Sequence, residues 1–443
     1  MIAKWGEYVR RHGMCVLVSL LSSCVHADPP ESPTTDSGRI SVEDFEYRGA
    51  FRLPHVAGGD SNWEYSGYAM TYWPEGDPSG DDDGYPGSLF IVGHDHHQMI
   101  AEVSIPKPVI SDAKQVNVLP AAAMLQPFTD ILSGQASELE IPRMGIEFLP
   151  SSDSASSGAL HWCIGQHFEF DRRPTHGIKG VQLSQADARG CWFLDGYSAY
   201  VLNDYLFEIP DSWSQKNLPG FRLATGRFRD GQWGGFGPAL VAYQPPDLAD
   251  APAANETITN CKPLLLYGQP QPGVAELAVH PDHKMNQFSE SDEWSGGAWL
   301  TAENRSAMML IGTKAIGKTW YGFSNGVVYP ISGDPNEPVP DVPDFPHDQR
   351  GWWSESIRAQ AILFDPEDLA KVARGEWKTW QPQPYQTLDL TKYLFESTFE
   401  HERQKRYLLG AAAFDRQRGV LYVVERRVKV DDERSVVHVF KIN

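Results

Sequence analysis

Histidine residues are the side chains of this sequence whose types and spacing most clearly suggest chemistry. His94 and His96 lie in the run 93–97 (GHDHH), and alternate side chains of an extended segment point to the same side. Imidazole nitrogens bind zinc, and they also accept protons near neutral pH. We expect His94, His96 and His167 to form a three-nitrogen metal site, an acid–base site or a hydrogen-bonding site for a ligand. Purely structural histidines are the alternative.

A divalent metal, zinc or calcium, is the cofactor class that the sequence allows. The segment 77–84 (DPSGDDDG) is rich in carboxylates, as calcium loops are, but the EF-hand spacing fails because Phe90 stands where a glutamate is needed. We therefore expect a solvated turn there. The chain also lacks GxSxG, P-loop, GxGxxG and HExxH motifs, which disfavours serine hydrolases, nucleotide-binding enzymes and metalloproteases.

Three further residues fit acid or charge-neutralising roles. Glu147 lies in an apolar strand, where a buried carboxyl can have a raised pKa and act as an acid; a structural hydrogen bond is the equal alternative. Arg143 and Arg350 carry guanidinium groups, which bind carboxylates and could neutralise an enolate. Arg350 belongs to a Pro- and Asp-rich insert, residues 322–353, that we expect to fold over the site.

Tryptophan side chains next to polar groups indicate a carbohydrate site. Trp63, Trp233 and Trp294 lie in loops beside apolar segments; aromatic faces stack on sugar rings while polar groups bind the hydroxyls. The expected polar partners follow apolar segments and are Gln166, Lys314 and Arg426. The alternative is that the tryptophans fill gaps between sheets.

The elements that must position these residues form a degenerate repeat. Each copy begins with a strand rich in small residues, and these first strands are expected at 68–73, 145–149, 237–243, 297–301 and 410–414. Second strands are expected at 88–93, 159–165, 263–268, 307–312 and 420–424. Third strands are clearest at 100–105, 200–209 and 436–442, and outer strands are expected at 116–119, 221–228 and 385–390. Short helices or turns are expected at 211–217 and 366–375.

This repeat predicts an all-β fold, a single β-propeller of about five blades, with six or seven as alternatives. Small residues suit inner strands, which crowd around a central channel, whereas later strands fan outward and can carry larger side chains. The segment 45–53 (FEYRGAFRL) is expected to complete the last blade and close the ring. Loops after second strands and loops before first strands then meet at one channel mouth, where the candidate residues gather. A non-closed, multi-sheet β protein is the alternative.

The N-terminal segment predicts export. Residues 1–23 have a basic start and an apolar core too short to span a bilayer, and LSSC at 21–24 is similar to a bacterial lipobox. We expect a lipoprotein signal peptide at 1–23, lipidation of Cys24, a flexible tether at 24–40 and the propeller at 41–443. The protein would then be a membrane-anchored lipoprotein in the periplasm or on the cell surface. Ordinary secretion is the alternative.

The overall charge and the cysteines limit the partners. The chain has 38 basic and 58 acidic residues and a net charge of −20; removal of 1–23 takes away three basic residues and one acidic residue and leaves −22. Such acidity disfavours nucleic acid and anionic lipid, so the membrane would be reached through the lipid anchor only. A polyanionic substrate would need a locally basic pocket. The remaining Cys163, Cys191 and Cys261 allow one disulfide at most.

The assembled sequence blocks resemble an uncharacterised family of exported bacterial β-propeller-like proteins. The blocks include 68–80 (YAMTYWPEGDPSG), 225–238 (TGRFRDGQWGGFGP), 350–353 (RGWW) and 384–390 (PYQTLDL), and the resemblance covers most of 45–443. It implies an exported propeller and transfers neither an activity nor a catalytic residue. At the level of the fold alone, some polysaccharide lyases use propellers with His, Tyr and Arg at the channel mouth.

Three functions are compatible with these features. The first is a carbohydrate-active enzyme, either a lyase on uronic-acid glycans or a glycoside hydrolase; in the lyase His94 or His167 would be the base and Arg143 or Arg350 the neutralising group. The second is a non-catalytic surface module that binds a glycan or another small polar ligand. The third is a structural propeller in an envelope assembly. The sequence does not indicate the oligomeric state.

Overall fold

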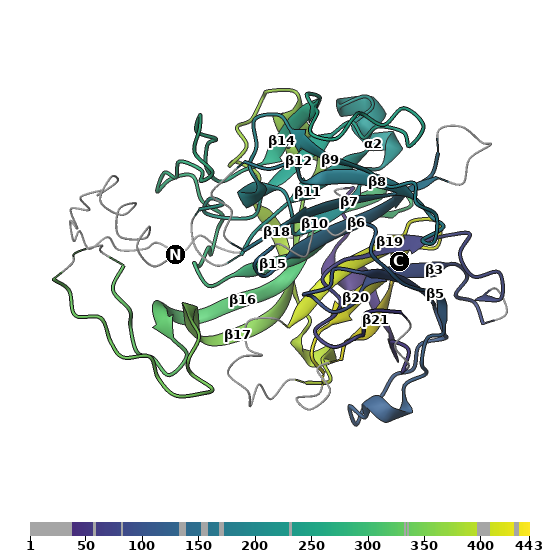
Figure 1. Ribbon diagram of the computed structural model, residues 1–443, viewed down its shortest axis with the longest axis horizontal. Helices are drawn as coiled ribbons and strands as arrows, with labels where there is room; N and C mark the ends of the chain where they lie inside the picture. Colours follow the sequence, from purple (N-terminus) through teal and green to yellow (C-terminus); the bar gives the residue numbers. More distant parts are fainter. Residues whose placement is uncertain are drawn as a thin grey trace.

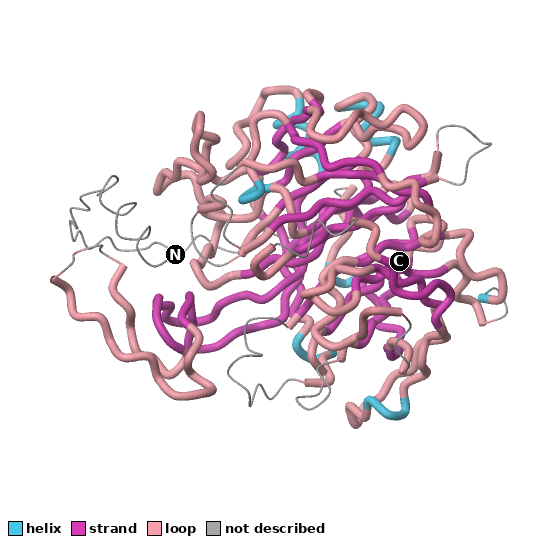
Figure 2. Tube along the Cα trace, viewed as in Figure 1, coloured by secondary structure: helices cyan, strands magenta, loops and turns pink. Residues whose placement is uncertain are grey.

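Five antiparallel sheets make up the protein. The computed structural model describes residues 38–55, 59–80, 83–132, 139–151, 158–167, 172–229, 233–331, 334, 336–396, 408–428 and 434–443. The sheets are arranged as the five blades of a β-propeller, which confirms the predicted fold class (Figures 1 and 2). The signal peptide, Cys24 and most of the tether predicted from the sequence lie outside the described residues.

Each blade runs from an inner strand at the axis to an outer strand. Blade A comprises β2 (Met70–Trp73), β3 (Ser88–Val92), β4 (Ile100–Ser104) and β5 (Met124–Thr129). Blade B comprises β6 (Arg143–Leu149), β7 (Ala159–Gly165), β8 (His176–Gly180) and β9 (Arg189–Leu194), with β13 (Thr257–Ile258) pairing in parallel at its edge. Blade C comprises β10 (Tyr205–Glu208), β11 (Leu223–Gly226), β12 (Leu240–Tyr243) and β14 (Cys261–Leu265).

The last two blades contain the longest strands and both ends of the ring. Blade D comprises β15 (Glu293–Ala302), β16 (Arg305–Phe323), β17 (Arg350–Phe364) and β18 (Pro384–Asp389). Blade E comprises β19 (Leu409–Asp415), β20 (Val420–Glu425), β21 (Val436–Ile442) and β1 (Phe45–Arg52). The inner strands contact one another in the closed circuit β2, β6, β10, β15, β19 and back to β2.

The N-terminal strand closes the ring, as predicted. β1 pairs antiparallel with β21, from Phe45 opposite Ile442 to Arg52 opposite Val436. In Figure 1 the purple N-terminal strand accordingly lies beside the yellow C-terminal strands. Blade E thus takes its outer strand from the start of the chain, which ties the first and last blades together. Packing begins slightly before residue 41, because Ile40 is fully buried.

Close approach of the inner strands explains the small residues found on them. A Cβ placed on Gly410 would lie 2.0 Å from the carbonyl oxygen of Gly67, and the Ala411 amide donates to that same oxygen at 2.9 Å. A Cβ on Gly145 would likewise lie 3.0 Å from the Leu206 amide nitrogen. The backbones of neighbouring blades therefore almost touch at the axis, and residues without a large side chain allow this contact.

Blade C departs from the predicted order of strands. The segments 237–243 and 263–268, predicted as first and second strands, form the third and fourth strands, and the predicted third strand at 200–209 contains the inner strand β10. This inner strand carries the bulky Phe207, which fits because a glycine faces it: a Cβ on Gly297 would lie 2.5 Å from the Phe207 ring. The space at the axis is thus provided by the neighbouring blade.

Helices are short and lie between the blades' strands in the sequence. The two predicted helices are confirmed as α2 (Asp211–Asn217) and α3 (Pro366–Ala373), and the Asp365 side chain caps α3 by accepting from the Glu367 amide. The predicted outer strand at 116–119 is instead the 3-10 turn η3 (Val116–Val118); other 3-10 turns are η1 (Val42–Asp44), η4 (Ala199–Val201) and η5 (Thr391–Tyr393). Across the described residues, helices capable of crossing a membrane are not found. Cys163, Cys191 and Cys261 are free thiols.

Candidate ligand-binding site at the channel mouth

Charged and aromatic side chains from all five blades meet at the end of the axis where the inner strands begin; we call this end the channel mouth. The starts of the inner strands of blades A to D supply Tyr68, Arg143, Asp204 and Glu293. Segments that follow second strands supply His167, Arg227, Arg229 and Arg426. The alternation of strand direction within each blade brings these two sets of positions to the same face.

Tyr68 is held between two arginines. The guanidinium carbon of Arg426 lies 3.3 Å from the centre of the Tyr68 ring, and that of Arg143 lies 3.6 Å from it. All three residues are buried, and Tyr68 is 4% exposed. Burial raises the pKa of the Tyr68 phenol, whereas the two guanidinium charges act to lower it. The arrangement therefore favours phenolate more than burial alone would allow.

Asp204 pairs with two arginines of blade C. Its carboxylate accepts three hydrogen bonds from Arg229, at 3.0, 3.1 and 3.3 Å, and lies 3.7 Å from Arg227 Nε. Burial and the neighbouring Arg229 charge lower the pKa of Arg227 to about 10, so its guanidinium group remains charged at neutral pH. Charge-assisted pairs of this kind fix the orientation of the arginine side chains.

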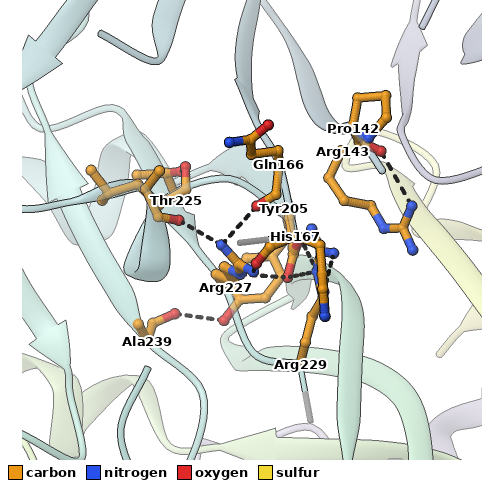
Figure 3. Close-up of polar contacts among 12 residues, drawn as sticks. Pro142, Arg143, Gln166, His167, Tyr205, Thr225, Arg227, Arg229 and Ala239 are labelled. Carbon is orange, nitrogen blue, oxygen red and sulfur yellow. Dashed lines mark hydrogen bonds and ion pairs between the residues drawn. The ribbon is translucent and has the colours of Figure 1, made fainter. Parts of the chain in front are cut away.

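His167 is oriented by the same arginines (Figure 3). Arg229 Nη1 lies 3.2 Å from His167 Nδ1, and Arg227 Nη2 donates to the His167 carbonyl oxygen at 2.7 Å. A guanidinium group has donors only, so His167 Nδ1 must accept, and the proton of the neutral ring then lies on Nε2. His167 is therefore arranged as a hydrogen-bond donor through Nε2, and the role of base that we expected from the sequence does not fit this geometry.

Glu293 lies at the centre of the charged groups. It is 6% exposed, and burial raises the pKa of its carboxyl while the charges of Arg143, Arg229 and Arg426 oppose that rise. It begins β15, next to the backbone contact between Phe228 and Trp294 that joins blades C and D. The carboxyl thus faces groups from blades B, C and E.

Positive charge prevails at the channel mouth although the whole chain is strongly acidic. The described groups within electrostatic reach of one another include five guanidinium groups, from Arg143, Arg227, Arg229, Arg426 and Arg427. They include three carboxylates, from Asp95, Asp204 and Glu293. Guanidinium groups buried beside aromatic rings bind carboxylates well, because they are weakly hydrated and donate in pairs. These groups make the channel mouth locally basic, as a polyanionic ligand would require.

Several residues expected from the sequence do come together here. Arg143, His167 and Arg426 belong to the cluster just described. The Gln166 carbonyl accepts from Arg227 Nη1 at 3.3 Å, and its side-chain oxygen accepts from the Glu140 amide at 2.9 Å, so Gln166 supports the loop that carries His167.

The histidine run of blade A lies at the rim of the mouth. The His94 ring lies 5.3 Å from the Tyr65 ring and 4.7 Å from the His97 ring, and its Nδ1 accepts from the His96 amide at 3.2 Å. Burial lowers the pKa of His94, which keeps it neutral at pH 7. The His96 side chain is 73% exposed. Within the described part of the chain, no three His, Cys, Asp or Glu side chains are grouped to hold a metal ion, so the predicted His94, His96 and His167 metal site is not formed.

Two of the three expected tryptophans are core residues. Trp63 is 2% exposed and packs on Phe128 at 4.5 Å, and Trp294 is fully buried between blades C and D. Neither ring has a face available to a sugar, so the alternative of gap filling is correct for both. Trp233 differs: it is half-buried at the mouth and contacts the Tyr200 ring edge to face at 5.5 Å.

Lys314 and Arg350 do not take the expected places. Lys314 Nζ donates to both oxygens of the buried Asp292 at 2.7 and 2.9 Å, which makes a structural ion pair behind the mouth. Burial raises the pKa of Asp292 to about 6 in spite of this partner. Arg350 lies 4.2 Å from the Tyr329 ring at the far end of the long β16–β17 hairpin, which extends away from the sheets (Figure 1).

Glu147 lies at the opposite end of the axis, in a polar ring to which every blade contributes. It accepts from Thr71 Oγ1 at 3.0 Å and from the Glu208 amide at 3.3 Å. Arg416 completes this opposite-end ring, because it pairs with Glu208 at 3.1 Å and donates to Thr301 Oγ1 at 3.3 Å. Burial, and then the Glu208 charge, raise the pKa of Glu147 to about 8. Glu147 therefore cannot act together with the arginines of the channel mouth.

Sequence reasoning missed Tyr68, Asp204, Arg227, Arg229 and Glu293 as site residues. Tyr68, Asp204 and Glu293 share one signal, since each is a polar or aromatic residue at or just before the start of an inner strand. That signal is readable once the inner strands are assigned correctly, and for Asp204 the misassigned blade C concealed it.

Comparison of the chain with known protein-family models and with curated proteins finds no match in either case. The candidate site therefore stands on its geometry alone.

Proposed function

We propose that the channel mouth binds an acidic carbohydrate and that the protein acts on it as a polysaccharide lyase. The observation that carries this proposal is the buried Tyr68 held between Arg143 and Arg426. A uronic-acid unit has a carboxylate next to the carbon that must lose a proton. The pair of guanidinium groups can bind that carboxylate, and the phenol beside them, once ionised, can accept the proton.

The elimination needs no cofactor and consumes no water. The Tyr68 phenolate takes the proton from C5 of the uronate, and the electron pair released forms the C4–C5 double bond. The glycosidic C4–O bond breaks, and the departing oxygen takes the proton back from Tyr68. Arg143 and Arg426 neutralise the charge that grows on the carboxylate in the transition state. His167 donates from Nε2 to the same ligand, in the orientation fixed by Arg229.

A glycoside hydrolase is the second candidate, and one observation favours it. Asp204 and Glu293 are two buried carboxyl groups at the starts of adjacent inner strands. Asp204 accepts three hydrogen bonds from Arg229, whereas burial raises the pKa of Glu293. A pair of carboxyl groups whose environments differ in this way can divide into a general acid and a base or nucleophile.

Product analysis distinguishes the two reactions. We would incubate the purified protein with polygalacturonate, alginate and a glycosaminoglycan, with neutral arabinan as the control. A lyase generates a C4–C5 double bond, detected by ultraviolet absorbance, whereas a hydrolase generates reducing ends without that absorbance. Reducing ends without absorbance would transfer the proposal to Asp204 and Glu293.

The Tyr68→Phe variant tests the assigned base. It should lower kcat on the cleaved polyuronate by about 10²- to 10⁴-fold with little change in KM, because only the proton acceptor is lost. Tyr72→Phe is the matched control: Tyr72 lies on the same inner strand, its hydroxyl donates to the Pro86 carbonyl, and it should retain full turnover. Full turnover in Tyr68→Phe would refute the assignment. Binding of acidic glycans without any product would indicate that the protein is a non-catalytic glycan-binding module.

We also propose that Cys24 is lipidated after removal of residues 1–23, which would hold the propeller on a membrane through its tether. The support is the LSSC sequence at 21–24 after a short apolar core. Metabolic labelling with palmitate should mark the wild type and leave Cys24→Ser unlabelled. Equal labelling of both chains would contradict the proposal.

A further inference from the structure

The β16–β17 hairpin continues well beyond its blade on the mouth side. β15 pairs with β16 only as far as Glu293 opposite Thr313, whereas β16 and β17 stay paired as far as Phe323 opposite Arg350. We call the projecting described residues, 314–331, 334 and 336–358, the arm. Its unaccompanied strands are about ten residues long, or about 30 Å at the usual rise per residue. Figure 1 shows the arm extending away from the sheets.

The tip of the arm carries a concentration of exposed apolar side chains. Of the eleven large apolar side chains that are exposed in the described residues, five are in the tip, at 58–67% exposure: Val328, Ile331, Val339, Val342 and Phe345. Exposed apolar groups that cluster in this way mark interaction surfaces, whereas single ones are ordinary. Core contacts therefore do not explain the composition of the tip.

A period of three residues organises the apolar and acidic groups of the tip. Val339, Val342 and Phe345 are exposed at intervals of three, and the prolines that follow each of them are half-buried. Asp341 and Asp344 recur with the same interval and are also exposed. The structure exposes both sets of side chains, and the His347 amide donates to the Asp344 carbonyl in a turn at the end of the segment; we call these exposed residues the stripe. Residues 331–349 contain five acidic residues and neither lysine nor arginine.

A rigid base holds this stripe away from its own blade. Trp353 is buried and donates to the Gly322 carbonyl at 3.2 Å, and the Tyr329 amide donates to the Tyr321 carbonyl at 2.9 Å. Folding the tip back onto the mouth of the same molecule would break the ladder between β16 and β17. The stripe is thus presented outward, in a form suited to another surface.

The chemistry that recognises an acidic, proline-rich stripe is a groove with aromatic walls and guanidinium groups. The channel mouth offers this chemistry on the same side of the molecule as the arm. At its rim the half-buried Arg427 guanidinium lies 4.8 Å from the half-buried Tyr65 ring, and the half-buried Trp233 lies beside Tyr200. The two surfaces are complementary in charge, and both belong to this chain.

We propose that the arm of one copy docks in the channel mouth of a second copy, and that two copies exchange arms about a two-fold axis. A two-fold arrangement satisfies both arms and both mouths and closes on itself. The exposed Asp341 and Asp344 lie against the arginines of the partner, and the apolar stripe lies against its aromatic rim. The inference is independent of the reaction proposed for the mouth.

Sedimentation velocity over a range of protein concentrations tests this dimer. The wild type should show a monomer–dimer equilibrium, and Asp341→Asn with Asp344→Asn should raise the dissociation constant about tenfold or more, because charge pairs across the interface are lost. Val342→Ser should also weaken the dimer while leaving the charge unchanged. Asp247→Asn with Asp250→Asn is the matched control: both residues are exposed on blade C, the net charge changes equally, and the dimer should be unaffected.

The proposal would be overturned by a wild type that is monomeric at every concentration, or by a dimer that Asp341→Asn with Asp344→Asn leaves as tight as before. A control variant that weakened the dimer as much as the arm variants would do the same. Polyuronate cleavage measured in parallel separates this inference from the proposed function. Because a docked arm and the substrate would occupy the same mouth, the arm variants should cleave at least as fast as the wild type, so that loss of the dimer and loss of activity are recognised as distinct failures.

Discussion

The two ends of the propeller axis are built from the same five inner strands and yet differ in chemistry. At the opposite-end ring, one polar residue from each blade bonds to its neighbours: Thr71, Glu147, Glu208, Thr301 and Arg416. At the channel mouth, arginines stack on both faces of Tyr68. Glu293 there lies in the field of three arginine charges, from Arg143, Arg229 and Arg426.

This difference indicates that the opposite-end ring has a structural role, whereas the channel mouth is the candidate site. Hydrogen bonds that run around the axis hold blades together, because each bond joins two sheets. The mouth arginines also join blades, since Arg426 donates to the Ser66 carbonyl at 3.1 Å and Arg227 to the His167 carbonyl at 2.7 Å, but several buried charges of one prevailing sign are costly. We interpret their gathering at the mouth as support for the anionic ligand proposed above. Variants at the two ends should therefore fail in different ways.

The largest expected effect is on stability and comes from the opposite-end ring. Arg416→Met removes the pair with Glu208 and the hydrogen bond to the Trp299 carbonyl at 2.9 Å, and should lower the free energy of unfolding by about 2–3 kcal/mol. Turnover at the mouth should be unchanged. Arg358→Met removes an exposed pair with Asp389 and should change stability by less than about 1 kcal/mol. Equal unfolding midpoints in denaturant for the two variants would contradict the structural role of the ring.

The next effect is a fall in stability with rising pH. The pKa of Glu147 is about 8 in the folded protein and near 4.5 in an unfolded chain. Between these values the unfolded chain loses the proton and the folded chain keeps it, so folding becomes less favourable as pH rises. Some exposure of the side chain reduces the full effect to about 2 kcal/mol across this window. Glu147→Gln should flatten the profile, and a mutant that kept the wild-type slope would show that another group is responsible.

Activity should depend on pH in the opposite direction. Tyr68 must lose its proton to act as a base, and burial raises the pKa of its phenol. Turnover should therefore rise with pH, by up to about tenfold per unit below that pKa. A profile of kcat against pH, taken where the protein stays folded, measures this. A rate that was constant or declining from neutral to alkaline pH would argue against a tyrosine base.

The smallest effect concerns the rim of the mouth. Trp233→Ala should weaken the affinity for an acidic oligosaccharide about fivefold with unchanged kcat, because one stacking surface is lost beside Tyr200. Trp377→Ala is a suitable control, since Trp377 packs under Lys371 on the outside of blade D. Identical affinities of the two variants would remove Trp233 from the site.

Much of the fold was predictable because inner strands are marked in the sequence by small residues. Residues such as Gly410 and Gly145 are required where backbones of neighbouring blades meet, and this pattern located the inner strands of blades A, B, D and E correctly. Blade C was misassigned because Phe207 occupies space provided by Gly297, which is distant in the sequence and belongs to another blade. Complementarity between two strands cannot be read from either one alone.

The candidate site was predictable only in part. Arg143, His167 and Arg426 were found because loops of one face were considered together. The prediction that Trp63 and Trp294 bind a sugar was wrong, because a tryptophan before a strand can turn toward the core, as both do here. The role of His167 depends on Arg229, 62 residues later, which fixes the tautomer. Such pairings follow from the three-dimensional contact and leave no sign in local sequence.

The most direct test is a crystal structure of the Tyr68→Phe variant with a bound uronate oligosaccharide. We expect the ligand carboxylate at the channel mouth, within hydrogen-bonding distance of the Arg143 or Arg426 guanidinium, with the target carbon facing residue 68. An oligosaccharide bound on the outer face of a blade or at the Glu147 end, with the arginine cluster unoccupied, would contradict the account.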